Sequence, residues 1–143
     1  MASILVDTHI FRRLKGSLRD LLYCISSIGD TIIYSKEIEN EYKIRTSPTE
    51  LMYYGYLQNV KKYINMEFKK SSRINARFKR NIRSIELSKH MPDNKWIRHA
   101  VSEGAKYIIS YNSDLAVRPF RTNEHLCRVI SPEFYIQENS NNK

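Results

Sequence analysis

Carboxylate side chains recur in this sequence at or near the ends of short apolar runs, or at the start of a helix. The four places are marked by Asp7, Glu41, Asp93 and Asp114. In an open sheet of parallel strands, ligands bind outside the carboxyl ends of the strands, so these side chains are expected at one edge. Clustered carboxylates repel one another, and a divalent cation with oxygen ligands relieves that repulsion. The pattern predicts a site for Mg²⁺ or Mn²⁺.

The elements that would position these residues alternate between strands and helices. Short apolar runs predict strands at 3–6, 31–34, 106–110 and 127–130, and the alternation of Ile82, Ile85 and Leu87 with polar residues predicts a further short strand. Helical spacing and start signals predict helices at 10–28, from Ser35 onward, from Ser47 to about Phe68, from Asp93 to Glu103, and from Ser131 onward. Gly29 and Gly104 are expected to end helices. The alternation predicts an α/β fold with a central, mainly parallel sheet.

Length and composition predict a single domain over residues 1–137, followed by a polar tail at 138–143. No apolar run approaches the roughly 20 residues that cross a membrane, and the N-terminus lacks the pattern of a signal peptide. Cys24 and Cys127 are too few for a disulfide framework and suit a reducing compartment as small buried residues. A cytoplasmic location is therefore expected.

Positive charge is concentrated in one segment, residues 61–83. The formal net charge of the chain is +9. The segment contains a single acid, Glu67, and its basic residues are Lys61, Lys62, Lys69, Lys70, Arg73, Arg77, Lys79, Arg80 and Arg83. Such a stripe is an electrostatic footprint for a phosphate backbone, which predicts binding of RNA. A solvated helix face is the alternative, and the part from Lys69 to Arg83 could be a helix or a mobile arm.

Five segments stand in a recognisable order along the chain. They are Val6-Asp7-Thr8-His9, Ser35…Glu41-Tyr42, Asp93…His99-Ala100, Ser110-Tyr111-Asn112-Ser113-Asp114-Leu115 and Val129-Ile130-Ser131-Pro132-Glu133-Phe134. In order and spacing they resemble the PIN domain family, metal-dependent nucleases that include the VapC-type toxins. The resemblance spans nearly the whole chain, least between residues 60 and 90. It implies a three-layer α/β/α fold.

The sequence departs from the family pattern at two positions. His9 stands where the family often has Asn. Ser110-x-Asn112-x-Asp114 stands where the family usually has Thr-x-Asp-x-Asp. Asn112 offers a hard cation a neutral carbonyl oxygen but no charge, so Asp114 would have to supply it.

The resemblance implies a set of site residues. Asp7, Asp93, Asp114 and Asn112 would bind metal, Glu41 would join the acids in catalysis, and Thr8, Ser35, Glu37 and Ser110 would support them. A side chain on a helix tilts toward the helix N-terminus, so Glu41 can point back at the sheet edge. Other roles stay open for the remaining residues: a helix-dipole partner for Glu37, an N-cap for Asp93, a turn residue for Asp114 and a turn hydroxyl for Thr8.

The function expected from these features is a Mg²⁺- or Mn²⁺-dependent endoribonuclease, toxin-like or RNA-processing, that hydrolyses phosphodiester bonds. The resemblance also implies an antitoxin-like protein partner and a homodimer, for which the Tyr-rich segment 53–63 offers an interface. One alternative is a catalytically degraded module of the same fold that binds RNA or a ribonucleoprotein. Two others are a regulatory protein that docks an acidic partner, and a phosphatase or nucleotidase on a related scaffold.

Overall fold

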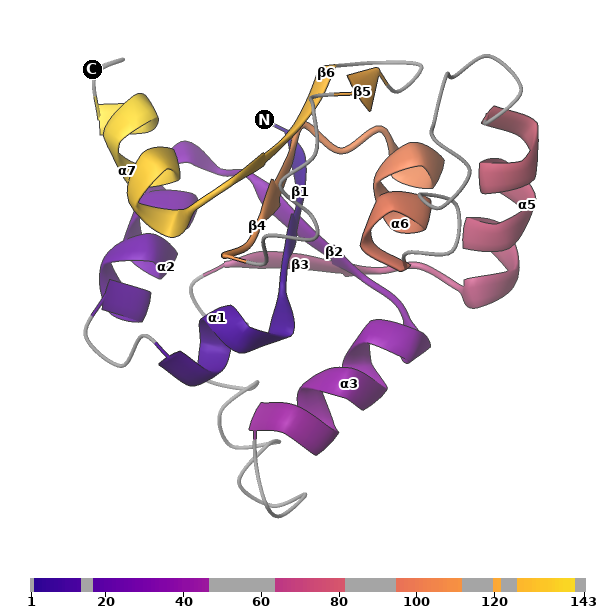
Figure 1. The fold of residues 1–143 in the computed structure, drawn as a ribbon, viewed down its shortest axis with the longest axis horizontal. Helices are drawn as coiled ribbons and strands as arrows, with labels where there is room; N and C mark the ends of the chain where they lie inside the picture. The colour runs from indigo at the N-terminus through magenta and orange to yellow at the C-terminus, as the bar shows by residue number, and fades with distance from the viewer. Residues whose placement is uncertain are drawn as a thin grey trace.

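The centre of the molecule is a six-stranded sheet with the strand order β3-β2-β1-β4-β6-β5 (Figure 1). The computed structural model describes residues 2–13, 17–46, 64–81, 95–111, 120–121 and 126–140. Its strands are β1 (Ser3–Val6), β2 (Thr31–Tyr34), β3 (Asn65–Phe68), β4 (Tyr107–Ile109), β5 (Phe120–Arg121) and β6 (Leu126–Ile130). All neighbours pair in parallel except β5, which pairs with β6 in antiparallel fashion. The predicted mainly parallel sheet is confirmed.

The order in which the chain adds strands to the sheet reverses between β1 and β4. From the central strand β1 the chain adds β2 and then β3 on one side, and it returns to place β4 on the other side of β1. Val6 at the end of β1 pairs with Ile109 at the end of β4. Ligands of open α/β sheets bind at such a switch point, outside the carboxyl ends of the strands. The residues that follow β1 and β4 therefore occupy the position that a ligand site would take.

Helices cover both faces of the sheet. In Figure 1, α1 (Thr8–Arg13), α2 (Ser17–Ile28) and α7 (Pro132–Ser140) lie on one side, and α5 (Ser71–Asn81) and α6 (Lys95–Glu103) lie on the other. Consecutive residues of a strand point to opposite faces, so Ile4 and Val6 pack in the α2–α7 layer while Leu5 packs in the α6 layer. The result is the expected three-layer α/β/α fold.

One further helix, α3 (Lys36–Thr46), follows β2 and packs with the α6 layer. Among the side chains of α3 whose burial the structure describes, Ile38 and Tyr42 are buried. The Tyr42 hydroxyl donates a hydrogen bond of 2.7 Å to the carbonyl oxygen of Val6, the last residue of β1. This bond ties α3 to the carboxyl end of the central strand.

The structure confirms most of the predicted elements near the sheet centre and corrects one prediction at the sheet edge. Gly29 and Gly104 end α2 and α6 with φ angles of 82° and 64°, a region in which glycine carries no steric penalty. The helix predicted from Ser47 to about Phe68 is wrong at its end, because Asn65–Phe68 form β3. Pairing with β2 satisfies the backbone of this segment, and residues 47–63 lie outside the described part.

Three other segments differ from the sequence prediction or refine it. The predicted helix 10–28 is two helices, α1 and α2. The basic segment, for which a helix or a mobile arm was expected, contains the helix α5. Residues 138–140, predicted as the start of a polar tail, continue α7. The short strand predicted near 82–87 lies outside the described residues. Of the helices that the structure describes, none has the length and apolar character that a membrane span requires.

Cys127 is buried in the core beside α6, as predicted for a small buried residue. Burial disfavours the thiolate and raises the pKa of the Cys127 thiol to about 12. The side chain therefore stays protonated at neutral pH and behaves as a small apolar residue. Cys24 is partly buried, and the two cysteines do not form a disulfide bond with each other.

Candidate active site at the switch point

Two side chains predicted for the site meet directly where β1 and β4 end. The Asp7 side chain follows β1 and is almost fully buried, with 5% of the residue exposed. The Ser110 hydroxyl follows β4 and donates a hydrogen bond of 2.7 Å to Oδ2 of Asp7. Backbone bonds continue the sheet past the strand ends, because the Asp7 amide donates to Ile109 and the Ser110 amide donates to Ile130. The sheet itself therefore holds this pair in place.

His9 forms a second support for the same carboxylate. The main-chain N–H of Tyr111 donates a hydrogen bond of 2.9 Å to Nε2 of His9. Because Nε2 accepts, a neutral ring carries its proton on Nδ1. Nδ1 lies 3.3 Å from Oδ2 of Asp7. Ser110 and His9 therefore both contact Oδ2 of Asp7, and these two contacts do not involve Oδ1.

Thr8, which the sequence assigned to a supporting role, follows Asp7 in the chain and carries a buried hydroxyl. Within the described part of the chain, Oγ1 of Thr8 has no hydrogen-bond partner. Buried polar atoms in native proteins are almost always paired with protein or with an ordered water or ion. A buried carboxylate and a neighbouring unpaired hydroxyl are oxygen donors that fit a hard divalent cation or the water bound to it.

Glu41 is held by a basic residue that the sequence analysis did not single out. Oε2 of Glu41 forms an ion pair with Nζ of Lys95, in the first turn of α6. The Glu41 side chain is largely buried, with 16% exposed. Its negative charge is therefore balanced within the protein. No local sequence signal marks this pair, because it depends on how α3 and α6 pack together.

Ser35 and Glu37 both connect α3 to α6. Nδ1 of His99 lies 2.6 Å from the carbonyl oxygen of Lys95, which can only accept, so Nδ1 carries the ring proton. Nε2 then accepts a hydrogen bond of 2.6 Å from the Ser35 hydroxyl. Glu37 accepts a hydrogen bond of 2.9 Å from Arg98. Ser35, which follows β2, is thus hydrogen-bonded through its hydroxyl to His99 of α6.

The buried His99 ring makes folding stability depend on pH. Burial lowers the pKa of His99, against weaker raising contributions led by the Lys95 carbonyl. Below about pH 6.5 the unfolded chain takes up a proton that the folded chain resists, so stability is lost as the pH falls. We expect the stability advantage of the wild type over His99→Gln to shrink between pH 7.5 and 5.5, by at most about 1.4 kcal/mol per pH unit. Urea unfolding at several pH values measures it, and a constant difference would contradict it.

Several basic residues of the segment 61–83 serve the fold. Glu103 is buried at the end of α6, and its two carboxylate oxygens lie 3.0 Å from Nε of Arg73 and 3.4 Å from Nε of Arg77. Arg77 also donates a hydrogen bond of 2.8 Å to the Ser102 carbonyl. These arginines fasten α5 to α6.

Three other basic residues of the segment, Lys70, Lys79 and Arg80, are exposed. Lys69 pairs with Glu67 at 2.5 Å in a surface ion pair, and such pairs contribute little to stability. Lys69 and Lys70 follow the carboxyl end of β3 directly, so they lie at the same edge of the sheet as Asp7.

The remaining predicted site residues lie outside the part that the structure describes. They are Asp93, Asn112, Asp114, Lys61, Lys62 and Arg83. Among the described residues, no three His, Cys, Asp or Glu side chains form a group of the kind that holds a metal ion. At the ends of β1 and β4, the described part of the candidate site consists of Asp7, Thr8, His9 and Ser110.

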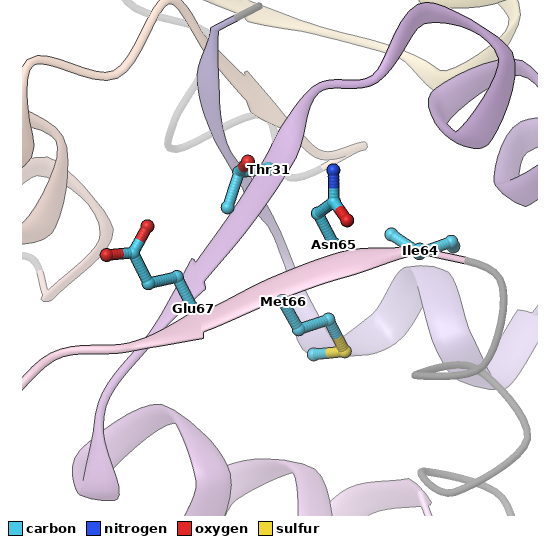
Figure 2. Close-up of a pocket in the computed structure, with 5 residues that line it drawn as sticks. All are labelled: Thr31, Ile64, Asn65, Met66 and Glu67. Atoms are coloured by element: carbon cyan, nitrogen blue, oxygen red, sulfur yellow. The ribbon is translucent and has the colours of Figure 1, made fainter.

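A surface depression of about 580 Å³ lies elsewhere, on the outer strand β3 (Figure 2). Thr31 and Asn65 line it at the first residues of β2 and β3, and Glu67 points to the same side of β3 as Asn65. These are the amino ends of the strands. The depression is therefore distinct from the edge at which Asp7 and Ser110 meet, and it contains none of the predicted site residues.

Comparisons with known proteins add no family to this description. No model of a protein family matches the sequence, and no curated protein matches it. The geometry of the site is therefore what supports a function for this chain.

Proposed function

We propose that this protein is a Mg²⁺- or Mn²⁺-dependent ribonuclease with a PIN-like active site at the switch point of its sheet. The observation that carries the proposal is the buried Asp7 carboxylate, which Ser110 and His9 both contact at Oδ2. Burying a carboxylate is costly, and a protein retains it where the charge has a use. A site that presents a fixed negative charge at a ligand-binding edge suits binding of a cation.

The residues that would hold the cation are Asp7 together with Asp93, Asp114 and the amide oxygen of Asn112. Such a cation lowers the pKa of a bound water and neutralises charge on a phosphate. The protein residues do the positioning: Ser110 fixes Oδ2 of Asp7, and the sheet backbone fixes Ser110. Lys95 balances the charge of Glu41, which limits mutual repulsion among the acids.

Lysines flank this site along the carboxyl edge of the sheet. Lys36 follows β2 after Ser35, and Lys69 and Lys70 follow β3. The side chain of Lys36 is 60% exposed, and Lys70 is also exposed. Lysine at an exposed edge binds phosphate as a point charge and carries no sequence information. An RNA strand that crosses these residues would pass toward Asp7.

Replacement of one of these lysines tests the path of the RNA. We expect Lys70→Gln to weaken RNA binding equally for unrelated sequences and to reduce the slope of log affinity against log salt by about 0.7, the loss of one phosphate contact. The measurement is fluorescence anisotropy at several salt concentrations without divalent metal. Lys106→Gln is the matched control, because Lys106 is an exposed lysine at the amino end of β4. Equal slopes for the two variants would contradict the path.

A second function is favoured by two specific features. Lys95 already neutralises Glu41, and Asn112 stands where the PIN family usually has an acid. Together they favour a module of the same fold that binds RNA or a ribonucleoprotein without cutting it. This module would use the lysines of the carboxyl edge and would not need a metal.

Cleavage of labelled RNA separates the two functions. The experiment incubates structured and unstructured RNAs with the purified chain in Mn²⁺, in Mg²⁺ and in EDTA. Cutting that requires metal supports the ribonuclease. Salt-dependent binding with no cutting in either metal supports the binding module.

A further inference from the structure

Tyr111 is a large aromatic residue that stays exposed beside the acidic site. It follows Ser110 directly, whose hydroxyl bonds to Asp7, and 38% of the residue is accessible to solvent. A single exposed aromatic residue is common on protein surfaces. What distinguishes Tyr111 is its position, next in the chain to the serine that holds Asp7.

Three contacts fix the position of Tyr111. Its main-chain N–H is bonded to His9. Its ring lies against the His9 ring, with centroids 5.9 Å apart and planes tilted by 32°. Its hydroxyl donates a hydrogen bond to Oε1 of Glu133, in the first turn of α7. A ring held at both ends loses little conformational freedom when a ligand packs on it.

We propose that Tyr111 is a base-stacking residue, on which an unpaired nucleobase of a single-stranded RNA packs next to Asp7. The inference rests on the proposed function for its ligand, and it names the substrate as unpaired RNA, because a base stacked in a duplex cannot offer its face to a side chain. Aromatic side chains recognise single strands by this contact, which tolerates any base. The lysines of the carboxyl edge would hold the backbone of the same strand.

Two variants separate stacking by the ring from fastening of α7 by the hydroxyl. Tyr111→Leu removes the ring, whereas Tyr111→Phe removes only the bond to Glu133. Binding of a short unstructured RNA of about 12 nucleotides is measured by anisotropy in EDTA, where no cleavage is required for the readout. We expect Tyr111→Leu to weaken binding by about 5- to 150-fold, and Tyr111→Phe to recover it to within about threefold of the wild type. Tyr23→Leu, which alters an exposed tyrosine of α2, is the control.

Abasic RNA gives a second test, which removes the bases and leaves the protein unchanged. The same RNA is made with abasic nucleotides throughout, and its binding to the wild type is expected to drop by a similar factor. On this abasic RNA the Tyr111→Leu variant should bind like the wild type. Equal binding of the normal RNA by the wild type and Tyr111→Leu, or equal weakening in Tyr111→Phe and Tyr111→Leu, would overturn the inference, and so would a wild type that binds normal and abasic RNA equally.

The readouts of stacking and of catalysis are independent. Binding that depends on the Tyr111 ring, without cleavage in any metal, supports the stacking residue and overturns the ribonuclease. Cleavage by a chain whose binding ignores the Tyr111 ring supports the ribonuclease and overturns the stacking residue.

Discussion

Asp7→Asn is expected to lower metal-dependent cleavage of RNA by about 10²- to 10³-fold, because an amide keeps the shape of the carboxylate but removes its charge. The Ser110 hydroxyl can still donate to the oxygen of the amide, so the strand ends should stay in register. Single-turnover cleavage of labelled RNA in Mn²⁺ measures the effect. Asp20→Asn, on the exposed side of α2, is the control and should cleave like the wild type.

Binding measurements complete this test. If Asp7 binds metal, calorimetric titration with Mn²⁺ should show weaker binding for Asp7→Asn, while RNA binding in EDTA should not weaken. Undiminished cleavage by a folded Asp7→Asn protein would refute the role of Asp7.

Ile108→Ala is expected to lower the free energy of unfolding by about 2–5 kcal/mol. Ile108 is fully buried in the middle of β4, where it pairs with Leu5 on one side and Val129 on the other. Truncation removes buried apolar surface and leaves a cavity between the central strands and α6. Urea unfolding reports the loss through the fluorescence of Trp96, the single tryptophan, which lies in the same buried cluster.

Two companion variants calibrate this value. Ile108→Val should cost about 0.5–1.5 kcal/mol, because it removes one methylene from the same site. Tyr23→Ala, at a position 73% exposed, should stay within about 0.5 kcal/mol of the wild type. A loss below about 1 kcal/mol for Ile108→Ala would show that the core can collapse around the truncated side chain.

The central strands could be predicted from the sequence because strands that are buried on both faces consist almost entirely of apolar residues. Ser3–Val6 and Thr31–Tyr34 are short apolar runs, and both became parallel strands with the predicted bounds. The outer strand β3 could not be predicted in this way. Only part of it is covered, so Asn65 and Glu67 are exposed and the run reads as the polar end of a helix. Its pairing with β2 is a tertiary contact that a local pattern does not encode.

The candidate site divides along the same line. Strand-end reasoning predicted that Asp7 lies at the carboxyl edge of the sheet, and the family resemblance implied Ser110 as a supporting residue; the two side chains meet there. Lys95 and His99 were not assigned a role at the site, since their contacts with Glu41 and Ser35 depend on how α6 packs against α3. For Tyr111, the sequence shows an aromatic residue after a strand but does not show that its ring stays exposed.

The order of the strands has a consequence for the newly made chain. β1 is translated first and ends in the centre of the sheet, yet Ser110, the partner of Asp7, follows 103 residues later. Pairings between such distant segments fold slowly, because the intervening loop must close before any contact forms. We expect a chain still on the ribosome to lack the site until the segment through Ser110 has emerged. Any activity of this protein would then begin only after β4 has joined β1.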